Sequence, residues 1–174
     1  MHVMAPKNKW ELSDMLNYSV DFPAPMAIRY PRGTAYDGLQ EYREPIEYGK
    51  AEWIYKEKDV VLFAAGSMVK TAKEVRDELK KIGYNCSLVN ARFAKPLDEE
   101  CIRELAKEHK LIVTLEEGIK LGGFGEQVAN FVAKKKLDTT VEIVAIPDEY
   151  VEHGNVDILR KEVGIDSEAV ENKI

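Results

Sequence analysis

The sequence predicts an α/β fold: a three-layer α/β/α arrangement around a mostly parallel sheet. From residue 51 onward, short apolar runs alternate with segments whose apolar residues recur every three or four positions, as buried strands alternate with amphipathic helices. The run at 60–65, Val-Val-Leu-Phe-Ala-Ala, is apolar throughout, which is typical of a strand buried on both faces. We therefore expect parallel strands joined by right-handed crossovers, with one antiparallel strand at an edge of the sheet.

The first elements of this unit are indicated by turn and cap residues. Residues 51–55 and 60–64 are β-prone runs around the charged turn 56–59, which predicts a hairpin. Ser67 is the expected N-cap of a helix, and Gly83 is the expected residue after its C-terminus. The buried face of this helix is predicted from apolar residues three to four apart: Ala72, Val75, Leu79 and Ile82.

The same pattern then repeats to the end of the chain. Residues 87–89, 111–115 and 141–146 are the next expected strands. Asp98 is expected to cap the helix between the first two of these strands, and the glycine loop 122–125 leads into the helix that follows the second. The expected buried residues of these two helices are Ile102, Leu105, Ala106, Val128, Phe131 and Val132. Two short helices, near 155–163 and 167–173, are expected to close the chain.

Residues 1–34 are not part of this regular alternation of strands and helices. They are predicted as a strand (2–5), a helix (8–19) and a strand (26–30), a piece too small to bury its own faces. Residues 35–50 are polar and turn-rich, as a linker is. The predicted organisation is thus a C-terminal remnant of one α/β domain at 1–34, a linker at 35–50, and a complete α/β domain at 51–174.

Composition excludes several classes of protein. The 174 residues carry a formal net charge of −6, which argues against a nucleic-acid partner because such proteins need a basic face. No apolar run approaches the roughly 18 residues that span a bilayer, and the N-terminus lacks the pattern of a signal peptide. Two cysteines provide neither a disulfide framework nor a zinc quartet. We expect a cytoplasmic protein without a membrane or nucleic-acid partner.

Common catalytic motifs are missing as well. The sequence has no phosphate-binding P-loop, no G-x-S-x-G elbow, and no three-glycine dinucleotide spacing after its first buried strand. The loop at 122–125 either presents N–H groups to an anion or lets a helix approach a strand closely, and we favour the second interpretation.

Histidines and paired carboxylates leave alternatives open. His109 is interpreted as an exposed charge at a helix C-terminus. His153 follows the last strand, where open α/β sheets bind ligands, but we favour a structural or interface role. Glu116 and Glu117 follow another strand, and they are either an acid–base or metal-binding pair or, as we favour, solvated or hydrogen-bonding groups.

Two arginines near the end of the N-terminal remnant are stronger candidates. Arg29 and Arg32 lie three positions apart in an extended segment, so that their side chains are expected to face different ways and not to share a ligand. One of them can pair with a carboxylate while the other binds a phosphate group.

Four sequence motifs together resemble those of one family, the 1-deoxy-D-xylulose-5-phosphate synthases of the transketolase superfamily. They are AIRYPRG at 27–33, VNARFAKPLD at 89–98, TLEEG at 114–118 and GGFG at 122–125. The resemblance covers essentially the whole chain but only about the last third of a synthase. It implies that residues 1–34 end a pyrimidine-binding domain and that 51–174 are a transketolase C-terminal domain.

The resemblance also implies a chemistry. Synthases of this family condense pyruvate with glyceraldehyde 3-phosphate on thiamine diphosphate and Mg²⁺, releasing carbon dioxide, and they are homodimers. Arg32 resembles the arginine that holds the phosphate of the acceptor, and Arg29 is a less secure candidate. The parts that bind the cofactor and the metal are missing, so the resemblance implies no catalytic, cofactor-binding or metal-binding residue in this chain, and no bound cofactor.

Two other assignments remain open at this stage. One is a stand-alone interaction or regulatory domain built from a transketolase C-terminal module. The other is one chain of a split transketolase or 2-oxo acid dehydrogenase whose missing half is a separate polypeptide.

Overall fold

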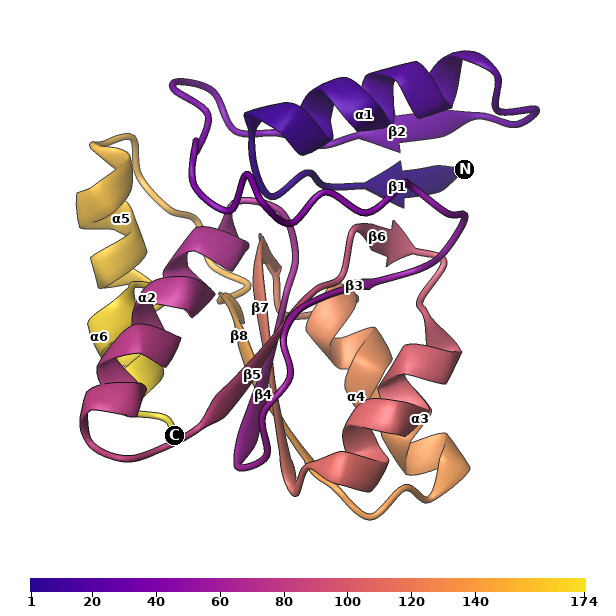
Figure 1. Cartoon of the computed structure of the whole chain (residues 1–174). Helices are drawn as coiled ribbons and strands as arrows, with labels where there is room; N and C mark the ends of the chain where they lie inside the picture. The colour runs from indigo at the N-terminus through magenta and orange to yellow at the C-terminus, as the bar shows by residue number, and fades with distance from the viewer.

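The computed structural model, which describes residues 1–174, contains a five-stranded sheet (Figure 1). Its strands in spatial order are β3 (Glu52–Tyr55), β5 (Cys86–Asn90), β4 (Val60–Ala64), β7 (Leu111–Ile119) and β8 (Thr140–Ile146). All neighbours are parallel except β3, which lies antiparallel to β5 at one edge. The predicted fold class, including the antiparallel edge strand, is confirmed.

Helices cover both faces of this sheet, as Figure 1 shows. On one side lie α2 (Met68–Lys81) and α6 (Ser167–Glu171), with α5 (Val156–Glu162) beside them. On the other side lie α3 (Glu99–Glu108) and α4 (Phe124–Lys135). Alternate residues of β4 supply the two cores, since its even-numbered positions pack toward α2 and its odd-numbered ones toward α3 and α4.

The predicted hairpin is wrong. Strands β3 and β4 follow one another along the chain, but β5 lies between them and pairs with both. The physical reason is that β4 is buried on both faces and takes the centre of the sheet, where its neighbours β5 and β7 run parallel to it.

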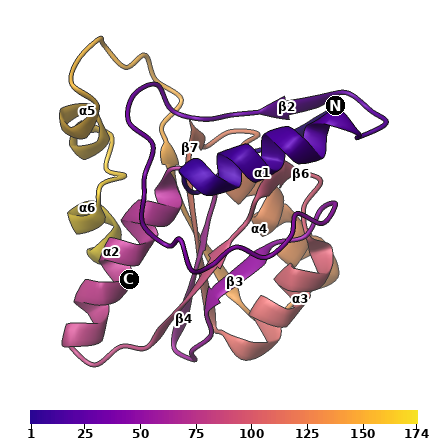
Figure 2. The same ribbon diagram turned by 45° about the horizontal axis from the view of Figure 1, so that its top comes forward.

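The N-terminal segment forms a second, smaller sheet that includes a strand of the large unit. Strand β1 (His2–Met4) pairs in parallel with β2 (Met26–Ile28), and α1 (Lys9–Val20) connects them. The other edge of β1 pairs antiparallel with β6 (Phe93–Lys95), which comes from the connection between β5 and α3 (Figure 2). A small core of Met4, Met15 and Phe93 joins the two parts. Residues 1–34 thus bury one face against the rest of the chain.

Residues 35–50 form no helix or strand, which is what the sequence predicted for a linker. They nevertheless contact the core of the large unit. Leu39 is only 4% exposed and belongs to the core beneath α2, and Tyr36 and Tyr42 pack against that core. This segment therefore attaches the N-terminal sheet to the large unit by apolar contacts.

A buried charge cluster lies where the two parts meet. Lys7 comes from the loop before α1 and Glu11 from the first turn of that helix. Glu52 comes from β3, Asn90 from the end of β5, and Arg92 from the turn after it. Lys7 Nζ lies 3.0 Å from Glu11 Oε1 and 2.6 Å from Glu52 Oε2, and the Arg92 guanidinium binds the same two carboxylates at 2.9 and 2.8 Å. All five residues are at most 5% exposed, so two cations and two anions neutralise one another out of contact with water.

Three local expectations were wrong, one of them only in part. Ile82 lies beyond the end of α2 and is 71% exposed, because the helix stops one residue earlier than the apolar spacing suggested. Ser67 occupies the N-cap position of α2, as expected, but its hydroxyl does not make the capping hydrogen bond. His109 is buried, not exposed: Nδ1 lies 3.1 Å from the Leu105 carbonyl oxygen and Nε2 lies 2.9 Å from Ser87 Oγ of β5, because the chain passes from α3 into β7 within two residues and keeps the ring against β5.

The two cysteines are expected to be unreactive in the folded protein. Burial raises the pKa of the Cys86 thiol to about 11 and also raises the pKa of Cys101, so almost no thiolate forms at pH 8. A chromogenic disulfide reagent at pH 8 should therefore release no colour until a denaturant is added, when two thiols per chain react. Fast reaction of either thiol without denaturant contradicts this burial.

Candidate functional site

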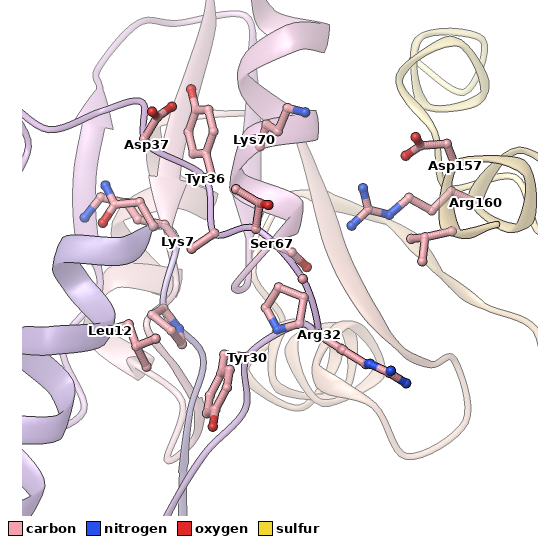
Figure 3. A pocket seen from close by; sticks show the side chains of 17 residues that line it. Lys7, Leu12, Tyr30, Arg32, Tyr36, Asp37, Ser67, Lys70, Asp157 and Arg160 are labelled. Atoms are coloured by element: carbon pink, nitrogen blue, oxygen red, sulfur yellow. The ribbon is translucent and has the colours of Figure 1, made fainter.

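A cavity of about 760 Å³ lies along the line where the two parts of the chain meet (Figure 3). Its walls come from the loop after β1, the segment 30–37, the start of α2, and α5. Arg32 lines this cavity; it is exposed and makes no ion pair with any acidic side chain. A cation left without a carboxylate at the rim of a cavity is available to an anionic ligand.

A second cavity of about 320 Å³ adjoins the first and is lined by Arg29. The two cavities share Tyr30, Pro31 and Ser67 as lining residues. Arg29 thus lines one cavity and Arg32 lines the other. This agrees with the expectation that the two side chains, three positions apart in an extended segment, face different ways. The backbone N–H of Arg29 donates to the Met4 carbonyl oxygen at 2.8 Å and continues the pairing of β2 with β1. No acidic side chain pairs with the Arg29 guanidinium, so the carboxylate partner considered for one of the two arginines is not found.

Glu117 lines the smaller cavity and contacts Ser67 and Arg160, two residues that line the larger one. Its Oε2 accepts a hydrogen bond from the Ser67 hydroxyl, which is why that hydroxyl is not used to cap α2. Its Oε1 accepts from Arg160 of α5, whose Nε and Nη2 lie at 2.8 and 2.6 Å. The Glu117 carboxylate therefore holds the Arg160 side chain beside the start of α2.

Glu116 faces a different environment. It is 4% exposed, and its Oε1 accepts from the Gly125 N–H at 2.8 Å, in the first turn of α4. Strand β7 continues to Ile119, so Glu116 and Glu117 lie within the strand and not after it, as the sequence had suggested. Because a carboxylate of the chain itself already occupies the N-terminus of α4, this helix end is not available to another anion.

The glycine loop before α4 is required for close packing, which is the interpretation favoured from the sequence. A Cβ atom at Gly123 would lie 2.6 Å from Glu116 Oε1, and one at Gly125 would lie 2.5 Å from Thr114 Oγ1. Neither position has room for a side chain unless its neighbours shift. The loop thus lets α4 meet β7.

His153 lies apart from these groups. It is exposed in the connection between β8 and α5 and makes no hydrogen bond within the chain. It is not brought together with Glu116 or Glu117, and no three His, Cys, Asp or Glu side chains are grouped so that they could hold a metal ion. The donor set of this chain does not fit a Mg²⁺ site, and the roles suggested for these three residues stay predictions.

Sequence reasoning missed the basic residues that the large unit contributes. Lys70, in the first turn of α2, and Arg160, on α5, both line the larger cavity. Nothing in their local sequence distinguishes them from other surface cations. Only the packing of α5 beside α2 and of residues 30–37 against both brings them near Arg32.

Comparison with known proteins agrees with this architecture. The chain is 47% identical over 173 residues to a 1-deoxy-D-xylulose-5-phosphate synthase of Lachnoclostridium phytofermentans, and 40% identical over 174 residues to one of Aquifex aeolicus. These matches cover 99% and 100% of this chain but 28% of each synthase. The chain therefore spans little more than a quarter of the curated relatives it matches.

Solved structures share the fold. A structure described as a split-gene transketolase, an inactive beta4 tetramer, superposes with a TM-score of 0.89 at 24% identity, over 99% of this chain and 55% of that one. The transketolase of Campylobacter jejuni superposes with a TM-score of 0.65 at 15% identity, over 99% of this chain and 25% of that one. Residues 49–170 match the family described as the C-terminal domain of transketolase. The chain belongs to the transketolase C-terminal domain family and is homologous to the C-terminal quarter of 1-deoxy-D-xylulose-5-phosphate synthases.

Proposed function

We propose that this chain is the C-terminal part of a thiamine-diphosphate-dependent 1-deoxy-D-xylulose-5-phosphate synthase. The observation that carries the proposal is 47% identity to such an enzyme over 173 residues, which includes both the N-terminal segment and the large unit. An isolated interaction module has no need of the N-terminal strand–helix–strand segment. We expect the complete enzyme to act in the cytoplasm as a homodimer. Its product, 1-deoxy-D-xylulose 5-phosphate, would serve as a precursor of isoprenoids, thiamine and pyridoxal.

In the proposed enzyme, this chain binds the acceptor and does not carry out the chemical steps. Thiamine diphosphate, when bound to the enzyme, supplies the carbanion chemistry that joins pyruvate to glyceraldehyde 3-phosphate. The residues present here do not fit that group, because they offer no cluster of metal ligands. Arg32 is the residue proposed to hold the acceptor phosphate, since it is exposed at a cavity without an acidic partner.

A fusion tests the function directly. The part of the Lachnoclostridium phytofermentans synthase that this chain does not match is joined to the N-terminus of this chain. With thiamine diphosphate, Mg²⁺ and both substrates, the fusion is expected to release carbon dioxide and form 1-deoxy-D-xylulose 5-phosphate. A folded fusion that binds the cofactor but forms no product contradicts the proposal.

The chain alone is expected to be silent in the same assay. It should show neither micromolar binding of thiamine diphosphate with Mg²⁺ in a calorimetric titration nor release of carbon dioxide from pyruvate, because the cofactor-binding parts lie elsewhere. Measurable decarboxylation by the purified chain overturns this expectation.

A split enzyme is the second candidate, supported by the likeness in fold to a chain of a split-gene transketolase. Mixing the same N-terminal part with this chain as two separate polypeptides distinguishes the two arrangements. Activity of the mixture equal to that of the fusion favours the split enzyme. Activity of the fusion alone favours a single polypeptide.

A further inference from the structure

The geometry points to a phosphate-binding site with two arms, in which Arg160 of α5 and Lys70 of α2 line the same cavity as Arg32. We propose that the large unit thereby contributes directly to binding the phosphate group of the phosphorylated substrate. This inference rests on the proposed function for the identity of that substrate. The site itself is argued from three basic residues that come from three separate segments.

The two arms are supplied by different parts of the fold. Arg32 lies in the segment after β2, whereas Lys70 and Arg160 belong to two helices of the large unit, α2 and α5. Figure 3 shows the Arg160 guanidinium extending from α5 toward the space beside Ser67, with Lys70 above it on α2. An anion in this cavity therefore meets cations from both parts of the chain.

Arg160 is oriented for this role by Glu117. The carboxylate binds Nε and Nη2 through a single oxygen, at 2.8 and 2.6 Å, which leaves Nη1 and the second N–H of Nη2 without an acceptor. The Arg160 side chain is only 21% exposed, so it is held in place before a ligand arrives. A guanidinium fixed along one edge loses little conformational entropy when its remaining N–H groups bind phosphate oxygens.

The other two cations are weakly engaged. Lys70 Nζ lies 3.7 Å from Glu74, with about half of each side chain exposed, and Arg32 has no acidic partner. Lys7 also lines the cavity, but its ammonium is neutralised within the buried cluster. Two acidic residues, Asp37 and Asp157, also line the cavity, and Figure 3 shows Asp157 close to Arg160. Arg32, Lys70 and Arg160 thus outnumber the aspartates among the charged residues of the lining outside the buried cluster.

The site can be tested on the chain itself, with inorganic phosphate as the probe. Phosphate is titrated at constant ionic strength and pH 7.5 into the isotopically labelled chain, and amide shifts are followed by NMR. Saturable shifts in residues 30–37, at the start of α2 and in α5 are expected. Arg160→Gln should weaken binding about tenfold and Lys70→Gln about threefold, as loss of charge-assisted hydrogen bonds does.

Lys161→Gln is the matched control, because it removes the same charge from the same helix but does not line the cavity. Folding of Arg160→Gln is checked by circular dichroism, and α5 has no buried residue whose packing would be lost. If Lys161→Gln weakens binding as much as Arg160→Gln, phosphate senses only overall charge and the proposed site is overturned. It is also overturned if Arg32→Gln abolishes binding while both other variants leave it unchanged.

The outcome separates this inference from the proposed function. If phosphate binding depends on Arg160 but the fusion forms no product, the phosphate site is supported and the proposed synthase function is contradicted. If the fusion is active but phosphate binding is unchanged in both the Lys70 and the Arg160 variants, the synthase function is supported and the proposed site is contradicted.

Discussion

Replacing Arg92 with methionine is expected to lower the free energy of unfolding by about 3 to 5 kcal/mol, the usual cost of leaving a buried charge without its partner. The guanidinium binds Glu11 and Glu52 at 2.9 and 2.8 Å, and the loss leaves two carboxylates facing one ammonium. It also donates to the Pro45 and Glu44 carbonyl oxygens, so the segment 35–50 loses two hydrogen bonds as well. Urea unfolding followed by circular dichroism measures the change.

Arg43→Met is the matched control for this experiment. Arg43 also joins α1 to the segment 35–50, through Asp14, but both partners of this pair are accessible to water. Its loss is expected to change stability much less than that of Arg92, because water and salt screen exposed ion pairs. The pKa of Asp14 is lowered by the hydrogen bond from Arg43, so the stabilisation from this pair is present at neutral pH and is lost as the pH falls through that lowered value.

A double variant provides the sharper test. Combining Arg92→Met with Glu52→Gln removes one charge of each sign, which leaves the buried cluster neutral. The double variant should therefore lose less stability than the sum of the two single variants. Additive losses, or an Arg92→Met variant no less stable than Arg43→Met, contradict the role given to the cluster.

In the fusion enzyme, Arg32→Ala is expected to reduce kcat/KM for glyceraldehyde 3-phosphate roughly thirtyfold or more, since a charge-assisted contact of this kind is worth about 2 to 4 kcal/mol. The contact forms in the ground state and persists in the transition state, so that its loss mainly raises KM. Steady-state kinetics with each substrate varied in turn measure the effect. Pyruvate, which has no phosphate, should keep its KM.

Unphosphorylated glyceraldehyde is the control substrate, because it offers Arg32 nothing to bind. Arg32→Ala should leave kcat/KM for this acceptor almost unchanged. The fold should also be unaffected, since Arg32 is exposed and has no partner in the chain. If both acceptors lose the same factor, Arg32 has a structural role and Arg29, which lines the adjoining cavity, becomes the better candidate.

The alternation of strands and helices was predictable because each element from β4 onward has a local pattern. The apolar run of β4, the cap at Asp98 and the helical spacing of Ile102 and Leu105 each depend on neighbours within a few residues. The place of each strand in the sheet was not predictable in the same way. The short turn at 56–59 indicated a hairpin. The position of β5 between β3 and β4 depends on how all five strands pack together, which no local pattern shows.

The candidate site was predictable at Arg32 and not beyond it. Arg32 belongs to a recognisable phrase, whereas Lys70 and Arg160 look like ordinary surface cations until three distant segments are packed together. The buried charge cluster was not predictable for a similar reason, because a charged residue in a sequence is normally interpreted as exposed on the surface. Two signals were present: Glu52 interrupts a β-prone run, and Arg92 comes two residues after the end of a fully buried strand.

The pairing of β1 with β6 has a consequence for synthesis on the ribosome. Strand β1 and the carboxylate of Glu11 leave the exit tunnel long before Asn90, Arg92 and β6 exist to receive them. Until then the nascent N-terminal segment keeps an unpaired strand edge, the kind of surface that binds chaperones or other chains. Its folding must therefore wait for the middle of the chain, so a ribosome that pauses before Phe93 should leave residues 1–34 open to protease, and one that pauses well beyond it should not.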